Sequence, residues 1–143
     1  LPASHVGTSI EQVRKGGNAK IYAYVHAAVG DFERSAKSAR KDLFNYAMAD
    51  GYARMFSQAG FADEIKELRA RQAEKDREGA LAAVSDRMIQ AIDFIGNKSE
   101  VTNFVKDYVK AGVEHPVLMP LPWGEDRRAI TDATISAAIK AVT

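Results

Sequence analysis

The stretch HPVLMPLPWGEDRRAI, residues 115–130, decides the fold of this chain. It begins as a short apolar run and passes into a loop that holds prolines, the single tryptophan and a glycine. A charged segment then starts a helical pattern. A buried strand that ends in a stiff loop just before a helix is a building unit of parallel α/β folds. The fold therefore depends on how many partner strands the rest of the chain supplies.

Two further segments have strand character. From Ile21 to Val29 every residue is apolar, aromatic or small except His26, and the run lies between Gly-Asn and Gly-Asp. Such a continuous apolar run predicts a strand buried on both faces, although its alanines leave a buried helix as an alternative. The shorter segment Ile92–Gly96 predicts another strand.

Helical periodicity accounts for most of the remaining chain. Apolar residues recur at spacings of three and four, with charged residues on the other face. Residues 1–8 predict a loop, and Gly16-Gly17 predicts the end of the first helical turns. The sequence predicts helical turns over Ser9–Lys15, and then a helical region that is capped by Asp31 and has a stop at Gly60. A surface helix is predicted over the charged residues 62–84, followed by a helix capped by Ser85. The next helix is capped by Asn97 or Ser99 and ends at Gly112, and a final helix begins at Ile130.

Strands alternate with helices, which predicts one α/β domain over residues 1–143 with two or three parallel strands and crossover helices. Two or three strands make an incomplete sheet. Each has the composition of a strand buried on both faces, yet most of them would be sheet edges. The pattern therefore indicates part of a larger α/β sheet or barrel.

Composition excludes several classes of protein. Lys+Arg 20 against Asp+Glu 19 gives a net charge of +1, which argues against a nucleic-acid partner. The absence of cysteine excludes disulfides, thiolate zinc sites and a cysteine nucleophile, and it fits a cytoplasmic protein. No apolar stretch approaches the roughly 18 residues of a membrane span. The three histidines are scattered and have no metal-ligand spacing, so no metal site is predicted.

Residues 91–130, AIDFIGNKSEVTNFVKDYVKAGVEHPVLMPLPWGEDRRAI, resemble the C-terminal end of the luciferase-like monooxygenase superfamily. The resemblance rests on a short strand ending at Gly96, the helix start Ser99–Glu100, Ala-Gly-Val at 111–113, and a strand followed by the Pro/Gly-rich loop 120–124. The segments KIYAYVHAAVGD and ARKDLFNYAMADGYARMFSQAGFADEI resemble the preceding strand and long helical region of the same family.

The resemblance implies a (β/α)8 TIM barrel of more than twice this length, of which this chain would be the C-terminal part without the N-terminal strands. It implies FMN or coenzyme F420 as cofactor, hydride transfer or oxygen activation as chemistry, and a small-molecule substrate. The isolated chain is then expected to be inactive. The methylenetetrahydromethanopterin reductase branch of the family is the nearest in pattern, but Trp123, Arg127 and Arg128 depart from it. This departure argues against specificity for a pterin substrate.

The candidate binding residues follow from the position of barrel active sites at the C-terminal ends of the strands. They are His26, Gly96, Pro122, Trp123 and Gly124. Each has a structural alternative: His26 as a core histidine, Gly96 as part of a helix cap rather than a phosphate site, and Trp123 as an aromatic cover on the strand end. No catalytic residue is assigned.

A second hypothesis belongs to another class of function. The chain could be a non-catalytic α/β or mostly helical module that forms homo-oligomers or associates through exposed strand edges. A flavin-binding chain would quench the fluorescence of added flavin, whereas an assembly module would not.

Overall fold

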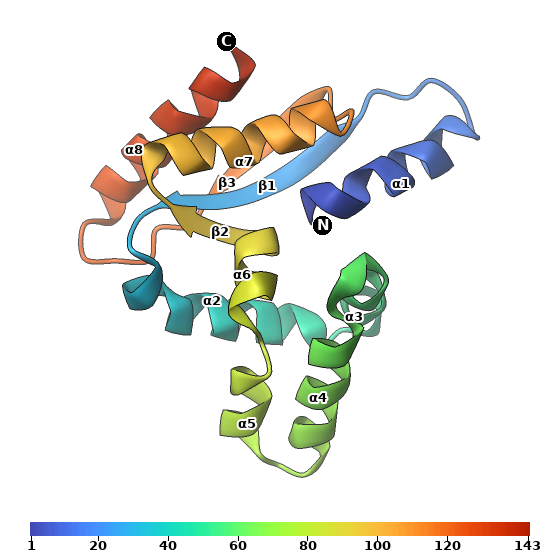
Figure 1. Ribbon diagram of the computed structural model, residues 1–143, viewed down its shortest axis with the longest axis vertical. Helices are drawn as coiled ribbons and strands as arrows, with labels where there is room; N and C mark the ends of the chain where they lie inside the picture. Colours follow the sequence, from blue (N-terminus) through green and yellow to red (C-terminus); the bar gives the residue numbers. More distant parts are fainter.

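Three parallel strands form the centre of the molecule in the computed structural model, which describes residues 1–143 (Figure 1). They are β1 (Tyr22–Val29), β2 (Asp93–Gly96) and β3 (His115–Pro120), and the sheet order is β2-β1-β3. His26 of β1 lies opposite Asp93 on one side and Met119 on the other. The prediction of two or three parallel strands is confirmed, with three strands present.

The strand order differs from that within a (β/α)8 barrel. In a barrel each strand is followed by a helix and then by its neighbour in the sheet. Here β3 pairs with β1 and not with β2, so the connection from β2 to β3 crosses over β1. The order 2-1-3 is that of an open, doubly wound sheet. The three strands are therefore an α/β sheet, and they do not by themselves form a barrel.

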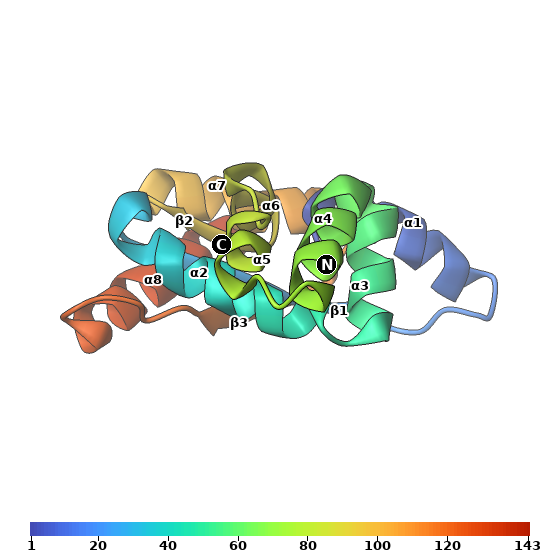
Figure 2. The ribbon, with the colours of Figure 1, turned by 90° about the horizontal axis from the view of Figure 1, so that it is seen from below.

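Nine helical segments surround the sheet: α1 (Ala3–Arg14), α2 (Phe32–Ala47), α3 (Asp50–Phe56), the π-helical turn η1 (Ser57–Phe61), α4 (Ala62–Ala73), α5 (Arg77–Ala82), α6 (Asp86–Ile92), α7 (Lys98–Lys110) and α8 (Arg127–Val142). Helices α2 to α6 belong to the connection from β1 to β2, and α7 to the connection from β2 to β3. The molecule is flat, and the segment between α1 and β1 projects from one end (Figure 2).

The prediction of a loop over residues 1–8 is wrong, because α1 already begins at Ala3. Its start is stabilised by tertiary contacts that the local sequence does not reveal. Val6 is buried in the same apolar cluster as Tyr108 of α7, and the Tyr108 hydroxyl donates a hydrogen bond of 2.7 Å to the carbonyl of Leu1. Packing of this kind supplies most of the stability of a short helix in a protein.

Two apolar cores lie on opposite faces of the sheet. One core joins α2–α6 to the sheet through residues such as Leu43, Leu68 and Ile95. The other core joins α1, α7 and α8 to the sheet through residues such as Val25 and Tyr108. Helices on both faces are expected where successive crossovers of the same hand run in opposite directions across a sheet.

Side-chain caps begin several of the helices at the predicted residues. Asp31 accepts a hydrogen bond from the backbone N–H of Arg34, and Ser85 accepts one from that of Met88. Asn97 forms a capping box with Glu100 at the start of α7, which decides between the two predicted caps of that helix.

The predicted stop at Gly60 is a kink within a longer helical region. Gly60 has φ of 104°, a left-handed value that suits glycine, and the chain continues directly into α4. The charged face of α4 is exposed as predicted, but Ile65 and Leu68 are buried in the core. Helix α4 therefore packs more deeply than its charge content indicates.

Proline limits further pairing at the outer edge of β3. His115 and Leu121 donate their backbone N–H to Ile21 and Ala27, on the β1 side. Because successive residues of a strand point their N–H groups to opposite sides, the nitrogens of Pro116 and Pro120 face the open edge. Neither can donate a hydrogen bond to another strand, and prolines in this position are typical of natural sheet edges.

The first half of β1 and the neighbouring residues of β3 leave one face of the sheet open. Tyr22, Tyr24, Val117 and Met119 lie on this face, and all four are exposed. Tyr24 keeps 65% of its surface accessible. Parallel sheets are usually covered on both faces, so this apolar area, called here the open sheet face, is an unusual feature.

Candidate functional site

A cavity of about 280 Å³ opens at the edge of the open sheet face. Apolar and aromatic side chains form most of its wall, and His26 and Asp93 contribute the polar groups. The lining residues come from both strands and helices: Leu1, Tyr24, His26, Leu43, Tyr46, Tyr52, Met55, Phe56, Ile92, Asp93, Tyr108 and Met119. Ligand sites commonly combine an apolar wall with a few convergent polar groups.

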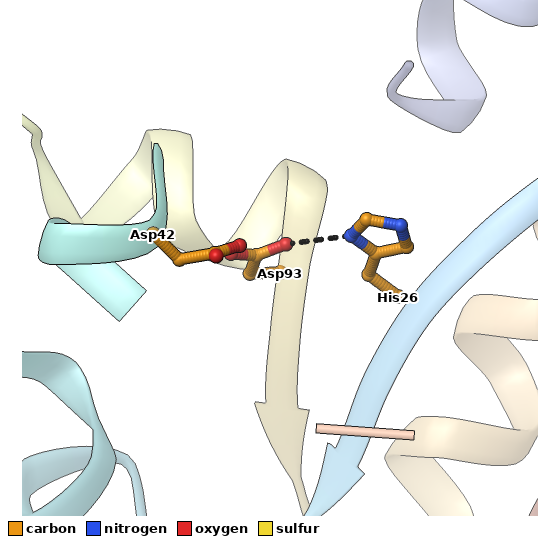
Figure 3. A group of neighbouring side chains, drawn as sticks. All are labelled: His26, Asp42 and Asp93. Atoms are coloured by element: carbon orange, nitrogen blue, oxygen red, sulfur yellow. Dashed lines mark hydrogen bonds and ion pairs between the residues drawn. The ribbon is translucent and has the colours of Figure 1, made fainter. Parts of the chain in front are cut away.

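His26 and Asp93 form the polar centre of this cavity (Figure 3). The Nδ1 atom of His26 lies 3.1 Å from Oδ1 of Asp93, and the carboxylate is fully buried. Pairing of β1 with β2 brings the two residues together, because they are opposite one another in the sheet. An ionised carboxylate can only accept, so Nδ1 donates and Nε2 is left as the free ring nitrogen.

Asp42 of α2 adds a second carboxyl group beside Asp93 (Figure 3). Burial and the nearby charge of Asp93, together with hydrogen bonding to Asp93, raise the pKa of Asp42 to about 6, against a partial lowering by His26. The folded protein therefore favours a protonated Asp42 over the range where a free aspartate is already ionised.

One oxygen of the site has no partner. Oδ2 of Asp93 is buried and receives no hydrogen bond from any N–H or hydroxyl group of the chain, whereas Oδ1 pairs with His26. Leaving such an atom unpaired costs about 1–3 kcal/mol, and more for a charged group. Unpaired buried polar atoms are rare in proteins and often mark a functional position.

Four of the residues that line the cavity are tyrosines: Tyr24, Tyr46, Tyr52 and Tyr108. The ring centroids of Tyr46 and Tyr52 are 4.8 Å apart, and Tyr46 lies 6.4 Å from the ring of His26. Burial, followed by the charge of Asp42, raises the pKa of Tyr46. The arrangement offers flat apolar walls for a planar organic ring and one imidazole that can accept or release a proton.

Among the predicted site residues, His26 alone lines this cavity. Gly96 is the last residue of β2 and Asp93 is the first, so the length of that strand separates them. A Cβ atom on Gly96 would lie 2.6 Å from Oε2 of Glu100 and 2.9 Å from the Phe94 ring. The close approach of Glu100 gives this glycine a structural role in the cap of α7.

An anion site at the start of α7 is not favoured by the geometry. The side chain of Asn97 accepts the N–H of Glu100, and the Glu100 carboxylate accepts the N–H of Asn97. These contacts occupy amides that would otherwise face a phosphate, and they place a negative charge at the position where the phosphate would bind.

Pro122, Trp123 and Gly124 lie in the loop between β3 and α8, and none of them lines the cavity. Trp123 is partly buried against the core formed with α2–α6, and its carbonyl accepts a hydrogen bond of 3.2 Å from Ser35 Oγ. This contact joins the loop to α2. The structure thus gives Trp123 the covering position that was the alternative to ligand stacking.

The residues that lie beside His26 in the structure were not predicted from the sequence. Asp93 carried a signal, because it is the one charged residue in the predicted strand Ile92–Gly96. Asp42, Tyr46 and Tyr52 carried none, since each fits the polar or mixed positions of an amphipathic helix. Only the packing of α2 and α3 against the sheet brings them to the cavity.

A protein-family model described as luciferase-like monooxygenase matches residues 2–115. The chain belongs to this family. The match covers β1, β2, α7 and the helices between them, and thus nearly all of the residues that line the cavity. No individual curated protein and no solved structure shows a significant match.

Membership of the luciferase-like monooxygenase family confirms the resemblance at the level of the superfamily. The reductase branch within the family is not distinguished by this match. No helix of the chain is both long enough and apolar enough to cross a membrane.

Proposed function

We propose that this chain is part of a flavin- or F420-dependent oxidoreductase of the cytoplasm that acts on a small organic substrate. The family match over residues 2–115 is the observation that carries the proposal. The cofactor supplies hydride transfer or oxygen activation when bound. The protein supplies the walls that orient a ring, and His26 as a group able to exchange a proton.

The size and lining of the cavity restrict what it would hold. Its volume of about 280 Å³ is near the lower limit of roughly 300 Å³ for typical ligand pockets. No lysine or arginine lines it, so it lacks a partner for a phosphate group. We propose that it takes an aromatic ring, from the cofactor or the substrate, while any phosphate is held by other parts of the protein.

The strand order does not support a closed barrel. A barrel would require β2 and β3 to be neighbours, whereas β1 lies between them. The proposal therefore rests on the family and the cavity, and FMN and F420 stay as alternatives for the cofactor.

A fluorescence titration of FMN and of F420 with the 143-residue chain tests the ring site. We expect one of the two cofactors to show saturable quenching that the Tyr52→Ala variant weakens. One aromatic contact contributes about 0.5–1.5 kcal/mol, so its loss is expected to weaken cofactor binding by roughly 2- to 12-fold. Tyr52 is partly exposed, so its removal does not open the core.

Tyr22→Ala is the matched control for this titration. Tyr22 is also an exposed tyrosine, but it stacks on His115 and does not line the cavity. Equal quenching by the wild type and both variants would show binding elsewhere. Absence of saturable quenching with both cofactors would contradict the proposed ring site.

The open sheet face favours a second function, association of two copies of the chain. We propose that a second copy covers Tyr22, Tyr24, Val117 and Met119, whose exposed apolar surface has no partner within the chain. Pairing along the edge of β3 is disfavoured by its two prolines, so face-to-face packing is the mode that we infer.

Sedimentation equilibrium tests this association. A mass of twice 15.6 kDa is expected for the wild type, and a mass of 15.6 kDa for the Val117→Lys variant, because a buried lysine would lack a counter-ion. Ile135→Lys, on the exposed side of α8, is the control and should leave the dimer intact. A monomeric wild type at high concentration would contradict the proposal.

A further inference from the structure

We propose that His26, Asp42 and Asp93 form a site for a divalent transition-metal cation of the zinc type, held between the sheet and α2. The three residues come from β1, α2 and β2, and each presents one potential ligand atom. These atoms all lie within 4.8 Å of one another. The inference goes beyond flavin-type chemistry, which does not require a metal at this position.

The unpaired oxygen of Asp93 is the first reason to place a cation here. Asp93 has no accessible surface, its Oδ2 has no hydrogen-bond partner, and its carboxylate lies between His26 and Asp42 (Figure 3). A buried carboxylate is stabilised by a counter-charge or by metal coordination. A cation that binds Oδ2 would satisfy the one buried atom of the cluster that the protein leaves without a partner.

The charge balance gives a second reason. Two carboxyl groups face each other here, and no lysine or arginine forms an ion pair with Asp42 or Asp93. A divalent cation would neutralise both carboxylates at once.

The donor set selects the class of cation. One imidazole nitrogen and two carboxylate oxygens match Zn²⁺, which accepts both kinds of ligand, better than Mg²⁺ or Ca²⁺, which prefer oxygen alone. Cation binding through Nδ1 would replace the proton that His26 donates to Asp93. The 3.1 Å between Nδ1 and Oδ1 lies within the roughly 3.0–3.4 Å that separates two ligands about 2.1 Å from Zn²⁺.

Small adjustments complete the coordination. Asp42 lies on a helix and is only partly buried, so its side chain can move toward the other two ligands. The adjacent cavity is lined by His26 and Asp93 and leaves room for water or a ligand atom in a fourth position. A site with three protein ligands and one open position is the arrangement of catalytic zinc centres.

Calorimetric titration of the chelator-treated chain with ZnCl₂ tests the proposal. We expect one Zn²⁺ per chain, a higher thermal midpoint in its presence, and visible absorption bands of low-symmetry Co²⁺ when CoCl₂ replaces zinc. Asp93→Asn and Asp42→Asn should each weaken binding by at least about tenfold. Asp42 is only partly buried, whereas Asp93 is fully buried. The Asp42→Asn variant therefore provides the test even if Asp93→Asn does not fold.

Two control variants separate this site from adventitious binding. His115→Ala removes an exposed histidine outside the cluster, and Asp63→Asn removes a carboxylate from the surface of α4. Both should bind one Zn²⁺ as the wild type does. The proposal is overturned if the wild type binds no zinc stoichiometrically, if His115→Ala abolishes binding, or if Asp42→Asn leaves the affinity unchanged.

Discussion

Replacement of Leu68 by alanine is expected to lower the free energy of unfolding by about 2–5 kcal/mol. Leu68 has no accessible surface and lies in the core that joins α2–α6 to the sheet. Its truncation removes buried methyl groups and leaves a cavity that the surrounding helices fill only in part. Urea unfolding, followed by circular dichroism, measures the change.

Leu68→Met is the matched control, because it nearly conserves volume and should cost less than about 1.5 kcal/mol. A loss below about 1 kcal/mol for Leu68→Ala would mean that α4 does not pack on the core as the structure describes. That result would support the interpretation of residues 62–84 as a surface helix, which their charge pattern predicts.

Replacement of Gly96 by alanine is expected to lower the free energy of unfolding by about 1–3 kcal/mol through overpacking. The new methyl group would lie 2.6 Å from the Glu100 carboxylate and 2.9 Å from the Phe94 ring. Displacement of Glu100 would also weaken the capping box of α7, at a further cost of about 0.5–2 kcal/mol. The same urea unfolding experiment measures both contributions together.

Gly30→Ala provides the comparison, because its nearest neighbour would be Ile95 Cγ2 at 4.0 Å. The comparison also decides between the two roles of Gly96. Reduced stability with unchanged cofactor binding would support the structural role. Unchanged stability with weaker binding would support the binding role that the sequence predicts.

Local sequence patterns predicted the elements whose stability is mainly local. The run Ile21–Val29 reads as a buried strand because nearly every side chain in it is apolar, and β1 occupies this position. Asp31, Ser85 and Asn97 cap helices through contacts three residues away. Such contacts depend only on neighbouring residues, so they can be read from the sequence.

Long-range contacts account for what the sequence did not reveal. Helix α1 begins early because Val6 packs against a core formed by residues far along the chain. The order β2-β1-β3 depends on how the crossovers pack, and nothing in the composition of the strands fixes it. The family resemblance predicted part of a barrel, and successive strands of a barrel are neighbours, whereas β1 takes the centre of this sheet.

The candidate site shows the same limit. His26 was recognised because histidine is the one residue type in its strand that normally titrates near neutral pH. Its partners Asp93 and Asp42 are 67 and 16 residues away in the chain, and they meet it through strand register and the packing of α2. Gly96 and Trp123 were predicted from barrel geometry; the structure shows packing contacts for both, and their role in binding stays a prediction.

Binding of the ring at the cavity is the central claim, and nuclear magnetic resonance tests it most directly. FMN and F420 would each be titrated into the isotopically labelled 143-residue chain. We expect saturable chemical-shift changes at His26, Tyr46, Tyr52 and Met55 with one of the two cofactors. Changes confined to Pro122–Gly124, or no saturable change with either cofactor, would contradict the claim.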